Sequence, residues 1–147
     1  MVFAYSRRIY LADTDAAGVV YFASLMSICH QAYEESLAMG GISLQDFLAD
    51  SSVAIPIVHS EMSFFRPIFC GDKITINLTA KQLNKPEFAI AYQIVASEKK
   101  LAQGSTRHVC INPKTRIKIP LPENIIQWLK LVAEEDSRGK DNPKIKS

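Results

Sequence analysis

The sequence predicts an α+β fold, in which an antiparallel sheet of about five strands wraps around one long helix. Apolar residues recur with helical spacing from Phe22 to Leu37, and residues 73–111 then alternate between apolar and polar. The connections within the alternating region are short, and short connections pair consecutive strands antiparallel. The helix has to bury its apolar face, and the inner face of the sheet is the available surface.

The individual elements follow from local signals. A short β-prone stretch at residues 7–11 leads into a turn-like segment at 12–18. The long helix ends at Gly40-Gly41, because glycine is the usual residue just past a helix C-terminus. The other elements follow from their periods: a short helix at 43–49, strands at 53–65, 73–81, 88–94 and 101–111, and a helix at 123–134. We expect the four strands after the long helix to form a meander.

The size and charge of the chain fit one globular domain. It has 147 residues, and we expect a single domain at 1–136 followed by a disordered basic tail at 137–147. A formal charge of +2 is not that of a dedicated nucleic-acid binder. The chain has no apolar run of the length that a transmembrane helix or a signal peptide needs. We therefore expect a cytoplasmic protein without a nucleic-acid or membrane partner.

The cysteines and histidines give no metal-binding pattern. Cys29, Cys70 and Cys110 are too few and too far apart for a disulfide framework or a zinc site, so we expect buried, reduced thiols. His108 and Cys110 point to one face of a strand, but two ligands do not make a site. The motifs of serine hydrolases, P-loop proteins and zinc proteases are also absent from the sequence.

The segment Asp13 to Gly18 is the most informative stretch and allows three interpretations. It begins like a calcium-binding EF-hand loop, but Ser24 stands where that loop needs a glutamate. It is also an ordinary turn composition, in which aspartates cap local N–H groups. The third interpretation is catalytic, because a carboxylate precedes a helix whose first residues, Tyr21 and Phe22, cannot cap its N–H groups. Such N–H groups stabilise an oxyanion, while the aspartate acts as a nucleophile or as a base for water.

Several other side chains are candidates for binding. His30, on the long helix, has a surface or packing role more often than a catalytic one, whereas His59 is a candidate for lining a pocket. Arg66, Lys85 and Arg107 are scattered bases that either form a solvated surface or hold phosphates of a substrate. The aromatic residues Phe64, Phe65 and Phe88 are expected in the core.

At this point the sequence resembles a known family, the hotdog-fold acyl-CoA thioesterases of the 4-hydroxybenzoyl-CoA type. The run Asp13–Phe22 followed by a helix carries the resemblance, and the segments 65–74 and 102–112 are similar to that family's bend and last strand. The resemblance covers residues 5–120. Within the family, the segment 29–35 is similar to the hydrolases of 1,4-dihydroxy-2-naphthoyl-CoA in phylloquinone and menaquinone synthesis. Ser24-Leu25 departs from the Asn-Tyr that many relatives carry and changes the first helical turn.

The resemblance implies a site and an assembly. Asp15 would be the catalytic carboxylate, acting as nucleophile or base, and the backbone N–H of Phe22 would polarise the thioester carbonyl. We expect Tyr21, Phe22 and Met26 to form an apolar pocket for an aromatic acyl group, with Gly18 also at the substrate, and Arg66, Lys85 or Arg107 to bind the CoA phosphates. The family uses no metal or cofactor. Its subunits form dimers with sites at the interface, often paired into tetramers.

Two other functions remain open on the same scaffold. A dehydratase or hydratase of acyl thioesters would need His59 or Glu61 to face the acyl carbons. A non-catalytic acyl-CoA binding module is the third possibility, because a fold by itself does not establish an activity.

Overall fold

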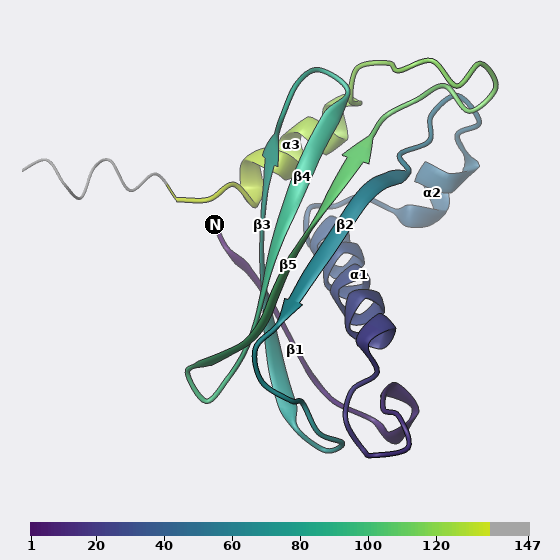
Figure 1. Ribbon diagram of the computed structural model, residues 1–147. Helices are drawn as coiled ribbons and strands as arrows, with labels where there is room; N and C mark the ends of the chain where they lie inside the picture. Colours follow the sequence, from purple (N-terminus) through teal and green to yellow (C-terminus); the bar gives the residue numbers. More distant parts are fainter. Residues whose placement is uncertain (136–147) are drawn as a thin grey trace, which may run out of the picture.

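The computed structural model describes residues 1–135 (Figure 1). The tail predicted at 137–147 lies outside the described residues. In chain order the elements are β1 (Phe3–Arg8), a 3₁₀ turn (Leu11–Asp13), α1 (Phe22–Met39), α2 (Leu44–Ala49), β2 (Ile57–Phe64), β3 (Lys73–Gln82), β4 (Glu87–Ala96), β5 (Lys99–Val109) and α3 (Glu123–Leu131). None of these helices is both long and apolar enough to span a membrane.

The five strands form one antiparallel sheet in the order β1-β3-β4-β5-β2. The predicted α+β fold, with its strand number and orientation, is confirmed. The hairpin from β4 to β5 turns through Ser97 and Glu98, whose φ angles are 50° and 65°. Two successive positive φ angles are typical of the type I′ turn, which matches the twist of the paired strands.

The long helix α1 lies along one face of the sheet (Figure 1). Its 18 residues begin and end close to the predicted bounds. Its buried apolar side chains share one core with those of the central strands: Leu25, Ile28, Cys29, Ala32 and Leu37 from the helix, and Ile74, Ile76, Leu78, Ile90 and Ile94 from the sheet. α3 closes this core with Trp128, whose indole N–H donates to Ser36 Oγ at 3.0 Å.

The structure corrects the predicted meander at its first strand. β2 does not pair with the next strand, β3, but with β5 at the far edge of the sheet. The connection at residues 65–72 carries the chain across to β3, and β1 occupies the other side of β3. The period of two indicates which face each residue occupies, but it does not indicate which strand is the neighbour.

Some element bounds also differ from the prediction. β1 occupies residues 3–8 rather than 7–11, because Ile9 already belongs to the loop and exchanges backbone hydrogen bonds with Gly71 and Asp72. α3 ends at Leu131, three residues earlier than expected. Cys70 is exposed, so the prediction of buried thiols holds only for Cys29 and Cys110.

Candidate active site

The loop before α1 holds Asp15 in a closed turn. The Asp15 N–H donates to the Val19 carbonyl at 2.8 Å, and the Gly18 N–H donates to the Asp15 carbonyl at 3.0 Å. Gly18 has a φ of +78°, which favours glycine. The carboxylate accepts the Ala17 N–H at 2.8 Å and the Val19 N–H at 3.3 Å, both on Oδ1. Among residues 1–135 no hydrogen-bond partner meets Oδ2, so this oxygen is available at the exposed end of the side chain.

Asp13 has a different environment from Asp15. Its side chain is only 17% exposed and forms an ion pair with Arg7. The same Oδ2 atom accepts the Tyr10 N–H at 2.8 Å. Asp13 is therefore committed to holding the loop, and Asp15 is the acid of this pair that can meet a substrate.

The N-terminus of α1 lies directly after this loop. Tyr21 is the N-cap residue and makes no side-chain cap, while its N–H donates to the Asp13 carbonyl at 3.0 Å. Within the described chain, the N–H groups of Phe22 and Ala23 have no acceptor. The Tyr21 and Phe22 side chains are 49% and 62% exposed. N–H groups without an acceptor at the positive end of a helix dipole are able to stabilise a developing oxyanion.

A shallow pocket of about 280 Å³ adjoins the loop. The Val20 N–H donates to the Ile68 carbonyl at 2.8 Å, and the Cys70 N–H donates to the Gly18 carbonyl at 3.0 Å. These bonds place the connection between β2 and β3 against the Asp15 loop. The pocket is lined by Val19, Val20 and Leu25 on one side and by Phe64, Phe65, Arg66, Pro67 and Ile68 on the other.

The structure brings some of the predicted site residues together. Gly18 and Tyr21 flank the loop, Met26 lies one helical turn after Phe22, and Arg66 lines the pocket. Phe64 and Phe65 were expected in the core, but each is 51% exposed and lines this pocket. Phe64 is the last residue of β2, at the edge of the sheet, and Phe65 follows it. Phe88 is buried as expected.

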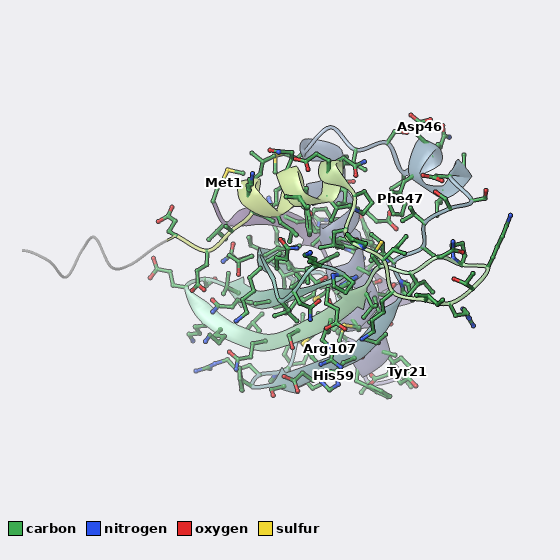
Figure 2. The ribbon with its side chains drawn as sticks, turned by 90° about the horizontal axis from the view of Figure 1, so that it is seen from above. Met1, Tyr21, Asp46, Phe47, His59 and Arg107 are labelled. Atoms are coloured by element: carbon green, nitrogen blue, oxygen red, sulfur yellow. The ribbon has the colours of Figure 1, made fainter. Side chains whose placement is uncertain are left out.

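Three of the predicted site residues, His59, Lys85 and Arg107, do not line the pocket beside the Asp15 loop. His59 on β2 and Arg107 on β5 are cross-strand neighbours and both are exposed. They lie on the opposite side of the molecule from Asp46 and Phe47 (Figure 2). His59 Nε2 is 3.5 Å from Glu61 Oε2. Lys85 follows the far end of β3, about 30 Å along the strand from the Asp15 loop.

Three polar residues were missed or undervalued by the sequence reasoning. Arg7 and Gln31 were not singled out, yet the Arg7 guanidinium donates to Gln31 Oε1 at 2.7 Å and also pairs with Asp13. His30 lies on the same face of α1 as Phe22 and Met26, at a four-residue spacing that could have identified it. Its Nε2 atom is 4.0 Å from Glu34 Oε1.

Comparisons with known proteins agree with this geometry. The model of the thioesterase-like superfamily matches residues 9–129. A 1,4-dihydroxy-2-naphthoyl-CoA hydrolase from Microcystis aeruginosa is 54% identical over 135 residues, covering 92% of this chain and 98% of that protein. A hydrolase of the same name from Rippkaea orientalis is 59% identical over 129 residues, covering 86% and 94%.

A solved structure gives the same result. The crystal structure of a 1,4-dihydroxy-2-naphthoyl-CoA thioesterase from Synechocystis matches with a TM-score of 0.85 at 41% identity, and the match covers 88% of this chain and 96% of that one. The hotdog fold that the motif at Asp13–Phe22 implied is thereby confirmed. The chain belongs to the thioesterase-like superfamily.

Proposed function

We propose that this protein is an acyl-CoA thioesterase that hydrolyses 1,4-dihydroxy-2-naphthoyl-CoA to 1,4-dihydroxy-2-naphthoate and CoA, in phylloquinone or menaquinone synthesis. One observation carries the reaction: the Asp15 carboxylate, with one oxygen unpaired among residues 1–135, lies in the loop that leads directly to two helix N–H groups that also lack an acceptor there. The names of relatives that are 54% and 59% identical support the substrate.

In the proposed reaction, the thioester carbonyl oxygen accepts hydrogen bonds from the N–H groups at Phe22 and Ala23. The Asp15 carboxylate either attacks the carbonyl carbon, forming a mixed anhydride that water then hydrolyses, or removes a proton from an attacking water. In both routes the C–S bond breaks and CoA leaves as a thiolate. Because the N–H groups are fixed by the fold, they stabilise the developing negative charge without reorganising.

A homodimer is part of the proposal. β2 is an edge strand, and every residue except Met62 is exposed in the isolated chain. A long, exposed edge strand is a template for pairing with another chain. Pairing through β2 would put His59 and Arg107 beside the partner, where basic side chains can reach CoA phosphates. Two dimers would then form the tetramer, and we expect the enzyme to act in the cytoplasm.

Steady-state hydrolysis by the wild type and by Asp15→Asn tests the proposal. The panel contains the dihydroxynaphthoyl, hydroxybenzoyl, phenylacetyl and long-chain acyl-CoA thioesters. We expect the dihydroxynaphthoyl thioester to turn over fastest, and kcat to fall by about 100-fold or more in the variant, because asparagine keeps the shape but not the charge. Asp46→Asn is the matched control. Asp46 is an exposed acidic residue on α2, and it lies well away from Tyr21 at the start of α1 (Figure 2).

Other results would point to other functions. Preference for an aliphatic thioester would keep the thioesterase and reject the substrate. Full activity of Asp15→Asn would remove Asp15 from the mechanism. Hydration of an enoyl-CoA without thioester hydrolysis would favour a hydratase, and CoA binding without any turnover would favour a binding module.

A further inference from the structure

We propose that Arg7 is a positioning residue of this thioesterase, which sets the loop of Asp15 relative to the N-terminus of α1 by holding Asp13 and Gln31 together. The inference rests on the proposed function, because it assumes that Asp15 and the helix N–H groups act on one substrate. Arg7 touches neither the substrate nor the reacting atoms in this proposal. It acts through the residues it holds.

The guanidinium of Arg7 connects three separate parts of the chain. Arg7 belongs to β1, and its side chain is only 12% exposed. Nη2 forms the ion pair with Asp13 in the loop, and Nη1 donates to Gln31 Oε1 of α1 at 2.7 Å. Nε donates to the Arg8 carbonyl at 3.1 Å, which fixes the orientation of the guanidinium plane. A planar guanidinium held at three nitrogens fixes the relative positions of its partners more firmly than the flexible ammonium of a lysine would.

Each group held by Arg7 has a direct connection to the site. The Asp13 carbonyl accepts the N–H of Tyr21, the residue at which α1 begins. Asp15 follows Asp13 by two residues, so the same anchor fixes the start of the Asp15 turn. Gln31 lies nine residues after Phe22 on α1, and its contact joins the middle of this helix to β1.

Two tyrosines add further contacts to the group that Arg7 holds together. The Arg7 guanidinium lies over the Tyr10 ring, 5.3 Å from its centroid, and the Tyr10 N–H donates to the same Asp13 oxygen. Tyr5 donates to Gln31 Oε1 at 3.5 Å. These contacts join Arg7, Tyr10, Asp13 and Gln31 into one network, and none of them involves the Asp15 carboxylate.

The test separates positioning from stability with two variants. Arg7→Met removes the guanidinium and leaves the charge of the largely buried Asp13 carboxylate without a partner, so both kcat and the unfolding temperature should fall. Adding Asp13→Asn removes the uncompensated charge, and asparagine still accepts the Tyr10 N–H. We expect the double variant to recover most of the unfolding temperature but to keep a kcat about 100-fold below the wild type, with KM within about threefold, because small displacements of catalytic groups are costly.

Arg8→Met is the matched control. Arg8 is the next residue of β1, it is exposed, and its side chain makes no hydrogen bond or ion pair within residues 1–135. The Arg8→Met variant loses the same charge from the same strand as Arg7→Met, and we expect its kcat to stay within about twofold of the wild type. Arg7→Lys restores a charge opposite Asp13 without the guanidinium, so we expect its unfolding temperature to recover further than its kcat.

The proposal is overturned if kcat follows the unfolding temperature across the series, with the double variant active like the wild type. It is also overturned if Arg7→Met keeps its kcat, or if Arg8→Met loses as much. Asp15→Asn is measured in the same assay: if that variant is inactive while Arg7→Met is normal, only the role of Arg7 is rejected. If Asp15→Asn is fully active, the proposed site itself is rejected.

Discussion

Two aspartates separated by one residue have different roles in this loop because their surroundings differ. Asp13 is paired with Arg7 and largely buried, whereas one carboxylate oxygen of the exposed Asp15 meets no partner within residues 1–135. The spacing of the two acids alone left open a calcium loop, a turn and a catalytic site. The turn and the catalytic interpretation are compatible, since Asp15 Oδ1 caps the turn and Oδ2 stays free.

His108 is a second residue whose environment decides its behaviour. It is buried on β5, its Nε2 atom is 2.8 Å from Thr106 Oγ1, and its ring stacks on Phe88 with centroids 4.6 Å apart. Among residues 1–135 its Nδ1 atom has no hydrogen-bond partner. Burial lowers the pKa of His108 from 6.5 to about 4, because the charged imidazole loses its hydration.

The depressed pKa of His108 predicts a loss of stability in acid. The unfolded chain binds a proton to this histidine near pH 6.5 and the folded chain only near pH 4, so stability is complete above pH 6.5 and declines between these values. Urea unfolding should give a free energy about 2 kcal/mol lower at pH 5 than at pH 7 from this group. His108→Gln removes the titration, and an unchanged pH dependence in that variant would contradict the assignment.

The helix α1 presents one buried face and one exposed face. Leu25, Ile28 and Ala32 bury one face against the sheet. The other face carries Phe22, Met26 and His30 at four-residue intervals, starting at the N–H groups of the proposed oxyanion site. His30 lies about 12 Å along the helix axis from Phe22, and helical side chains lean back toward the N-terminus. A two-ring acyl group placed along this face would bring a hydroxyl near the imidazole.

This arrangement predicts a role for His30 in substrate preference. For His30→Ala we expect kcat/KM for 1,4-dihydroxy-2-naphthoyl-CoA to fall by about 10-fold, the loss of one hydrogen bond, with little change for naphthoyl-CoA without hydroxyl groups. Glu35→Ala is the control, since Glu35 is an exposed residue of α1 on a different face. An equal loss on both substrates would show that His30 does not recognise a hydroxyl group.

At the scale of the whole molecule, the sheet leaves β2 as an exposed edge. Ile57 and Val58 are 41% and 51% exposed, which is unusual for apolar residues of a long strand unless a partner covers them. The neighbouring residues His59 and Arg107 can contact a substrate's CoA phosphates if a second subunit brings its own site to this edge. The proposed dimer would therefore complete the site as well as cover the strand.

A substitution that disrupts this edge should abolish the dimer and lower the activity together. Val58→Glu places a charge on each side of the proposed twofold contact, so we expect a dimer by light scattering for the wild type and a monomer with at least about 10-fold lower activity for the variant. Leu83→Glu introduces the same charge at another exposed apolar residue, 42% exposed after β3, and should leave the dimer intact. A wild-type monomer that is fully active would contradict the proposed assembly.

Local sequence patterns were sufficient to predict the α+β class, the bounds of α1 and the segment that carries Asp15 and Phe22. These depend on local information: the period of the apolar residues and a contiguous motif. The three-dimensional structure was needed to show that β2 pairs with β5, that Phe64 and Phe65 line a pocket, and that Arg7 contacts Gln31, 24 residues away. The physical reason is that strand neighbours and side-chain contacts depend on how distant segments meet, and a period of two or 3.6 residues contains no information about the partner.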